Sequence, residues 1–350
     1  MSNPPRPSSL SLLSCLVTVT LYASVSSASP WLLPPDTLVL SGRYDYASAS
    51  EEFLADEGTL QRYPLEGRYL ANTYTLGARF GLSERFELEM SLPLKVVSFR
   101  SDPVILLTPP EGGDSFNFYQ ENIISFNQSS VGLGDLNLAA RFSLSAYPIA
   151  SSIELAVSAP TGYQAPAGTF GAKPSSSDDF VAQAQELARP ENIRDDVTLG
   201  DGVFSFTPTF HAGFGSSFGL FVRGSAGVRI RNGGAGDQLI TEAKTGYFIT
   251  QWMLVYGGVY SELALSRGRV IGLSIAADDP SLPAEEYEGL ENLKPIPVTL
   301  DRDLIATPIG VLFKPLKAVD MTLTYSPIVS GRNVAKAHTV SVGVNVVSSY

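Results

Sequence analysis

Cysteine and histidine are almost absent from this sequence, which removes several kinds of chemistry. The only cysteine, Cys15, lies in an apolar N-terminal run, so a chain without that run has no disulfide and no cysteine nucleophile. The two histidines, His211 and His338, are far apart and lack the spaced partners of a metal site. The composition therefore predicts neither a metal centre nor thiol chemistry.

Long hydrophobic runs and charged residues are also scarce. Hydrophobic residues make up 44% of the chain, yet after the N-terminal run no stretch approaches the roughly 20 apolar residues of a spanning helix. Only 17% of residues are charged and the net charge is −11, which argues against nucleic acid as a partner. A surface that faces lipid around a polar interior would combine many apolar residues with no long run.

The N-terminus has the layout of a secretory signal peptide. Arg6 precedes an apolar run at 10–23 and a row of small residues at 24–29, so cleavage is predicted after Ala28. A signal anchor kept in the inner membrane is the alternative, which the shortness of the run disfavours. We therefore predict a signal peptide at 1–28 and one barrel at 29–350, with a net charge of −12 once Arg6 is lost.

Residues 71–97 carry the clearest structural pattern. From Phe86 to Val96 every second residue is apolar and mostly polar residues stand between, and a similar run precedes the short turn at 81–84. Period-two alternation places the two kinds of side chain on opposite faces of a strand, so the stretch predicts an antiparallel hairpin. Strands of about 10 residues or more with one apolar face match a tilted crossing of a bilayer.

Similar patterns recur along the chain and predict an all-β, antiparallel transmembrane barrel of about twelve strands. The other strands are predicted at 36–46, 132–145, 151–163, 198–214, 218–231, 238–250, from Trp252 onward, and at 301–313, 319–329 and 337–350. Pro208 predicts a bulge or break, and the strand from Trp252 is apolar on both faces, so its register is unreadable. Every second connection is short, as expected for short periplasmic turns and long extracellular loops.

The connections and the aromatic residues give further expectations. The insertion at 164–197 is interpreted as a lid or constriction, with a short helix through Phe180 and Leu187 capped at 177–179. The acidic stretches at 178–179 and 278–291 are either solvated loops or cation sites shared with lipopolysaccharide. The candidates for interfacial aromatic girdles are Tyr74, Tyr247, Trp252, Tyr256, Tyr260 and Tyr325.

Three motifs resemble one family of outer-membrane barrels. They are GLSERFELEMSLPL at 81–94, VGLGDLNLAARFSL at 131–144 and SAPTG at 158–162. In order and spacing they resemble the MetA-type transporters associated with the phenol-degradation meta pathway. The resemblance covers the first half of the mature chain and implies uptake of a small, often apolar or aromatic, solute. Long-chain fatty-acid-type channels are a related class, but no separate N-terminal plug is expected, because the first strand begins just after the signal peptide.

The last strand resembles the C-terminal signal of Gram-negative outer-membrane proteins. It alternates valines with polar residues and ends on the aromatic Tyr350, a pattern read by the barrel-assembly machinery. This resemblance implies a location in the cell outer membrane, with lipid and lipopolysaccharide as neighbours.

The polar faces of the predicted strands would line the lumen. The lumen-lining candidates are Glu87, Glu89, Lys95, Asp135, Arg141, Glu154, His211, Arg223, Arg229, Arg231, Glu242 and Lys244. The arginines at 223–231 either guide an anion or face carboxylates across the lumen. The alternative is that these charges pair with one another and with water and select no solute.

Catalysis is not indicated. Ser341 follows His338 by three residues without a third group, and the GLGD stretch at 132–135 lacks the lysine of a phosphate loop. No cofactor is therefore expected. The sequence favours a channel for passive passage of a small solute. The alternative is a structural or adhesive barrel with a filled lumen, because barrels of this size lie between filled and channel-forming ones.

Overall fold

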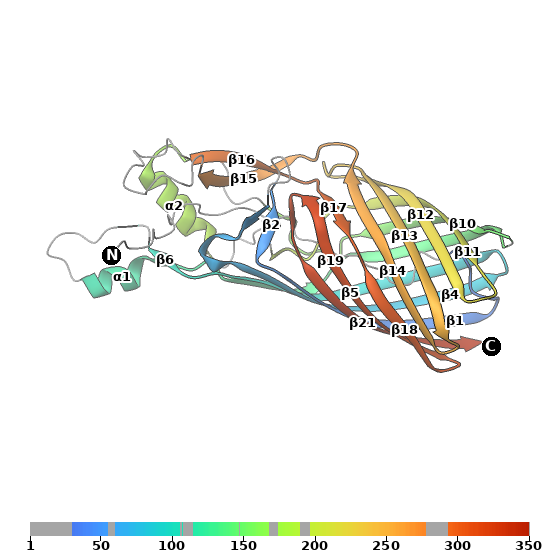
Figure 1. Cartoon of the computed structure of the whole chain (residues 1–350). Coiled ribbons are helices and arrows are strands. Elements are labelled where there is room, and N and C mark those ends of the chain that lie inside the picture. The colour runs from blue at the N-terminus through green and yellow to red at the C-terminus, as the bar shows by residue number, and fades with distance from the viewer. Residues whose placement is uncertain are drawn as a thin grey trace.

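A computed structural model describes residues 30–54, 60–105, 107, 115–146, 148–167, 174–189, 197–277 and 293–349. The predicted signal peptide at 1–28, the acidic stretch at 278–291 and Tyr350 lie outside these residues. Most of the described residues form strands, which gather into one barrel with two short helices beyond one end (Figure 1).

Twelve antiparallel strands close the barrel, which confirms the predicted fold class and strand number. In chain order they are β1 (Thr37–Ala49), β4 (Arg68–Ser83), β5 (Phe86–Arg100), β8 (Gln128–Leu133) with β9 (Leu136–Ser145), β10 (Ala150–Ala159), β11 (Ser205–Gly215), β12 (Leu220–Arg231), β13 (Gln238–Thr250), β14 (Met253–Ala264), β17 (Asp303–Ala306) with β18 (Ile309–Leu316), β19 (Val319–Arg332) and β21 (His338–Ser349). The first and last pair from Thr37 opposite Ser349 to Ser48 opposite His338. Closure removes the unpaired edges of an open sheet.

Two of the twelve strands are interrupted. β8 and β9 both pair with β5, and Gly134 and Asp135 separate them. β17 and β18 both pair with β14 and β19, and Thr307 and Pro308 separate them. These breaks turn twelve crossings into fourteen strand segments.

Pro208 breaks one ladder, as predicted, but no bulge forms. It stays in register with Leu155 of β10, whereas the β11–β12 ladder has no pair at positions 207 and 208. The register is the same on both sides of the gap, with Phe206 opposite Ile230 and Thr209 opposite Gly227. Proline has no N–H to donate, so the bonding to one neighbour is lost there.

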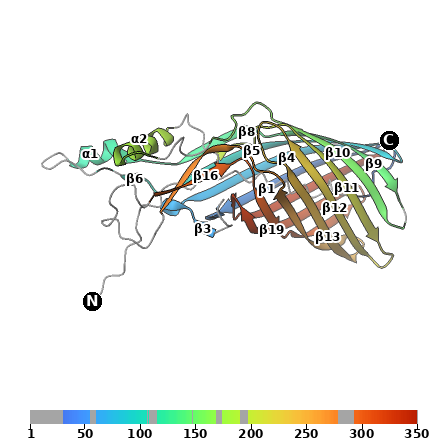
Figure 2. The same ribbon diagram turned by 90° about the horizontal axis from the view of Figure 1, so that it is seen from above.

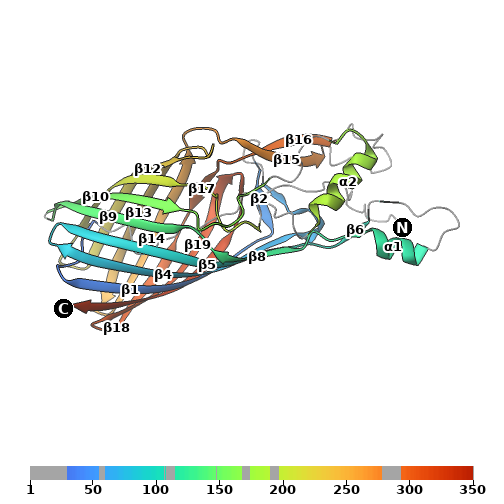
Figure 3. The ribbon, with the colours of Figure 1, turned by 180° about the vertical axis from the view of Figure 1, so that it is seen from behind.

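The connections alternate in length, as predicted. At one end, which we call the short-turn end, the turns are 84–85, 146–149, 216–219, 251–252 and 317–318, and the C-terminal strand finishes there (Figure 1). At the opposite, long-connection end lie β2 (Glu51–Phe53), β3 (Leu60–Arg62), η1 (Pro64–Glu66), β6 (Val104–Ile105), α1 (Ser115–Asn122), β7 (Ile123–Ile124), α2 (Ser177–Leu187), β15 (Val270–Ala277), β16 (Leu293–Thr299) and β20 (Val334–Ala335). Figures 2 and 3 show both helices beyond this same end.

Alternation along each strand separates an apolar exterior from a polar interior. On β5, Leu88, Met90 and Leu94 on the outer face are 42–49% exposed. Glu87, on the opposite face of the same strand, is 0% exposed. A belt of such side chains around a closed barrel is the surface that a bilayer requires.

The faces of β14 correct one expectation. Val255 and Val259 are 40% and 47% exposed, whereas Tyr256 is 7% exposed and points inward. The Tyr260 hydroxyl donates a hydrogen bond to Glu262 at 2.6 Å inside the barrel. Tyr256 and Tyr260 are therefore not girdle residues, and the sequence misled because both faces of β14 carry apolar side chains. The other girdle candidates are exposed to 39–53%: Tyr74, Tyr247, Trp252 and Tyr325.

Helix α2 packs outside the barrel against another long connection. Its Phe180, Ala184 and Leu187 are buried together with Ile124 and Phe126. The cap is Ser176, just before the predicted cap at 177–179, and its hydroxyl accepts the Asp179 N–H at 3.1 Å. No helix in the described ranges is long and apolar enough to cross a membrane.

Candidate functional site in the barrel interior

The interior is apolar at the short-turn end and cationic just beyond it. An apolar ring lines a cavity of about 370 Å³ and consists of Leu33, Val39, Phe221, Leu254, Leu312 and Val347. The same cavity is lined by Arg43, four residues after Val39 on β1, and by Arg223, two residues after Phe221 on β12. Together with Arg79 and Lys244 they form what we call the cationic tier.

Register and glycine explain how β12 and β13 hold two cations side by side. Arg223 lies directly opposite Lys244, and this row continues to Gly213 on β11 and Gly258 on β14. A Cβ on Gly258 would lie 2.7 Å from Cγ of Lys244, so glycine makes room for the long side chain. Like charges directly opposite each other are unfavourable, and one carboxylate, Glu242, lies beside both.

A second cluster surrounds Arg141 on β9. Its guanidinium is 2% exposed and lies 3.2 Å from Glu87 and 3.6 Å from Glu89, and it also pairs with Glu154. Glu87 and Glu154 are its cross-strand neighbours on β5 and β10, so the sheet register builds the cluster. Three carboxylates around one guanidinium leave an excess of negative charge. Arg79 offsets part of it, because its Nε lies 3.7 Å from Oε1 of Glu87.

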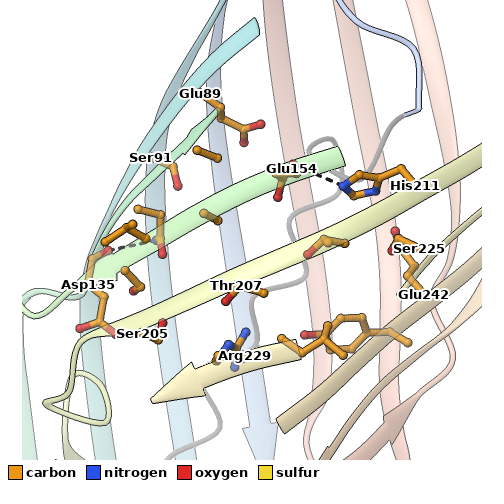
Figure 4. Close-up of a pocket in the computed structure, with 18 of the residues that line it drawn as sticks. Glu89, Ser91, Asp135, Glu154, Ser205, Thr207, His211, Ser225, Arg229 and Glu242 are labelled. Carbon is orange, nitrogen blue, oxygen red and sulfur yellow. Dashed lines mark hydrogen bonds and ion pairs between the residues drawn. The ribbon is translucent and has the colours of Figure 1, made fainter. Parts of the chain in front are cut away.

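A polar cavity of about 200 Å³ occupies the middle of the barrel (Figure 4). Its hydroxyl lining consists of Ser91, Ser158, Ser205, Thr207, Thr209, Ser225, Thr324 and Ser326. Glu154 and His211 point toward each other from neighbouring strands, with Oε2 and Nε2 3.5 Å apart. Such a lining offers hydrogen bonds in several directions, so it suits water and polar parts of a solute.

A buried ion network follows toward the long-connection end. Arg302 lies 3.2 Å from Glu262 and 3.4 Å from Asp201, while Arg231 lies 2.9 Å from Asp201 and Arg229 lies 3.3 Å from Glu262. Glu262 and Arg302 are no more than 2% exposed. The sequence-based candidates did not include three members of this network. Glu262 lies on the strand of unreadable register. Asp201 and Arg302 fell within the strands predicted at 198–214 and 301–313, but β11 begins only at Ser205 and β17 at Asp303, so both residues lie in connections.

Apolar packing closes the long-connection end. Val197 and Leu199 are buried against inward-facing residues that include Tyr69, Val97 and Phe99. The residues at 197–202, which we call the loop tip, are held by polar bonds as well. Lys95 Nζ donates to the Leu199 carbonyl at 2.5 Å. Full burial of one leucine side chain contributes about 1.5–3 kcal/mol.

The segment at 30–36 crosses the interior at the short-turn end. The Leu33 N–H donates to Glu87 at 2.7 Å, and a Cβ on Gly81 would overlap the Pro34 carbonyl. On β11, a Cβ on Gly213 would lie 2.6 Å from Pro30. The first strand begins at Thr37, close behind the predicted signal peptide as expected, and the seven residues before it turn into the lumen.

The predicted site residues fall into two groups. Those that line one of the two cavities are Glu89, Asp135, Glu154, His211, Arg223, Arg229, Arg231, Glu242 and Lys244. Glu87, Lys95 and Arg141 line neither cavity and are held in the contacts described above. The Asp135 carboxylate accepts from Tyr163, whose hydroxyl in turn accepts the Gly202 N–H of the loop tip at 3.0 Å.

A closed twelve-strand barrel with an apolar exterior and a charged, cavity-bearing interior has the fold of outer-membrane β-barrels. The COG4313 outer membrane channel from Pseudomonas putida F1 is similar, with a TM-score of 0.59 and 11% identity over 92% of this chain and 99% of that one. The CymD monoaromatic hydrocarbon channel superposes with a TM-score of 0.40 and 9% identity over 91% of this chain and 89% of that one. No family model matches the sequence, and no curated protein matches it.

Proposed function

We propose that this protein is an outer-membrane channel for passive passage of a small solute. The observation that carries the proposal is that the two interior cavities share the lining residues Glu89, Ser91 and Lys244, so they lie next to each other along the lumen. The similar barrel from Pseudomonas putida F1 is itself an outer membrane channel. Outer-membrane barrels have short periplasmic turns, so in the proposed channel the short-turn end faces the periplasm. Insertion by the barrel-assembly machinery and contact with lipopolysaccharide stay predictions.

The resemblance to MetA-type transporters favours an apolar or aromatic solute. The apolar ring supports this choice, because Phe221, Leu254 and Leu312 offer hydrophobic contact inside the barrel. The loop tip at 197–202 would act as the lid of the outer entrance, and the segment at 30–36 would narrow the inner exit.

Single-channel conductance in a planar bilayer tests the channel. We expect small, discrete steps from protein refolded from residue 29. Protein refolded from residue 36 should give steps at least twofold larger, because Leu33 and its neighbours no longer occupy the lumen. A heat-dependent shift in gel mobility checks that both barrels are folded. If neither folded form conducts, the channel proposal fails.

One observation favours the alternative, a structural or adhesive barrel. The clusters around Arg141 and Arg302 fill much of the interior with paired charges, and the long connections have a packed core of their own. A filled barrel would show no conductance in either form. It would instead lose surface binding when the connection bearing α2 is shortened.

A further inference from the structure

The cationic tier and the apolar ring lie in one cavity, and their combination is more specific than either alone. The lining of this cavity carries four cationic side chains, Arg43, Arg79, Arg223 and Lys244, but only two carboxylates, Glu89 and Asp320. The central cavity next to it has the opposite balance, with the carboxylates of Glu89, Asp135, Glu154 and Glu242 against Arg229, Arg231 and Lys244. Cationic side chains therefore outnumber carboxylates in the lining of this cavity, and behind the lining Arg43 pairs with Asp45 at 2.8 Å and Arg79 lies 3.7 Å from Glu87.

Arg223 is the member of the tier with unused hydrogen-bonding capacity. Its Nε is buried and has no hydrogen-bond partner among the residues that the structure describes. Its closest ion-pair partner, Glu242, lies 3.7 Å from Nη2 and also pairs with Lys244. An unsatisfied buried donor of a charged group is costly, and an incoming acceptor would remove that cost.

The other two arginines of strand β12, Arg229 and Arg231, differ from Arg223 because their side-chain donors have hydrogen-bond partners within the barrel. Arg229 contacts Glu262 and Gln238, and Arg231 contacts Asp201 together with the Gly236 and Leu300 carbonyls. Their donors are used to hold the barrel wall and the loop tip. Arg223 is thus the arginine of β12 that is left to meet a solute.

We propose that the cationic tier and the apolar ring form a binding subsite for a small organic carboxylate with an apolar body. The carboxylate would accept hydrogen bonds from Arg223 and lie near Arg79 and Arg43, since a planar guanidinium matches carboxylate geometry. The body would lie against Phe221 and Leu254, which flank the tier in the same cavity. This proposal rests on the proposed function only for access to the lumen, and it names the class of solute.

Equilibrium binding tests the subsite without requiring conductance. Isothermal titration calorimetry of the folded barrel in detergent would compare benzoate with benzyl alcohol, a neutral molecule of similar size, and with acetate, which lacks the apolar body. We expect benzoate to bind at least tenfold more tightly than either. Arg223→Gln should weaken benzoate binding about tenfold, because one charge-assisted pair is lost, and Arg223→Lys should restore part of it.

Arg189→Gln is the matched control, because it removes the same charge from the exposed end of α2, outside the cavity. Equal affinity for benzoate and benzyl alcohol, or an unchanged affinity in folded Arg223→Gln, would overturn the proposal. Binding that depends on Arg223 in a barrel that does not conduct would uphold the subsite and reject the channel. Conductance without such binding would do the reverse.

Discussion

At the scale of single residues, the stability of the barrel interior depends on a few buried charged side chains. Arg141 is the clearest case, because Glu87, Glu89 and Glu154 surround one guanidinium that is 2% exposed. Taking one partner out of a buried pair leaves the others desolvated without compensation. Each such cluster therefore links neighbouring strands, and removing one of its members destabilises the fold because the remaining charges stay buried without a partner.

Arg141→Met should lower the free energy of unfolding by about 3–5 kcal/mol, because three carboxylates then face one another in the barrel wall. Urea unfolding in detergent, followed by the heat-dependent shift in gel mobility, measures this change. Arg189→Gln provides the comparison: its pair with Glu186 is 55–59% exposed, and such pairs contribute about 0–1 kcal/mol. Equal losses in the two variants would refute the role of the Arg141 cluster.

At the scale of elements, helix α2 is fixed by its cap. The Asp179 carboxylate accepts the Ser175 N–H at 2.7 Å and bonds from the Ser175 hydroxyl and the Gln183 amide. The Ser175 N–H, followed by the Gln183 amide, holds the pKa of the Asp179 carboxyl below its ordinary value. These bonds need the ionised form, so the start of the helix responds to acid.

Because the folded pKa of Asp179 is depressed, its stabilisation is complete above the unfolded value of about 3.9 and is lost as pH falls through the folded pKa. We expect protection of the amides of α2, corrected for intrinsic exchange rates, to decrease below about pH 4. Hydrogen exchange measured by mass spectrometry between pH 3 and pH 6 follows this. Asp179→Asn should show weak protection that no longer varies over the range, and a pH-dependent decrease in that variant would assign the effect elsewhere.

Individual strands differ in how well the sequence predicted which face points inward. Strict alternation predicted the faces of β5, β9 and β12, because one face of each is apolar and the other polar. On β14 both faces carry apolar side chains, so Tyr256 and Tyr260 were assigned to the wrong side. Asp201 and Arg302 meet only through the closure of the barrel, and no local pattern in a connection indicates such a contact.

At the scale of the whole molecule, the lumen is narrowed twice along its length. The loop tip at 197–202 packs into the long-connection end, and the segment at 30–36 crosses the short-turn end. Two constrictions on a single path act as resistances in series, so opening one leaves the other to limit the current. The serial arrangement of the two constrictions thus predicts how the conductance changes when both are opened together.

Asp201→Asn should loosen the loop tip, because its pairs with Arg231 and Arg302 hold the residues just after Leu199 to the barrel wall. In single-channel recordings, this variant should raise the conductance, and protein refolded from residue 36 should raise it at least twofold, as stated above. The combination should raise conductance by more than the sum of the two increments, since only then is neither constriction limiting. Increments that merely add would mean that solute passes the two closures by separate routes, and a single continuous lumen would then be the wrong description of this barrel.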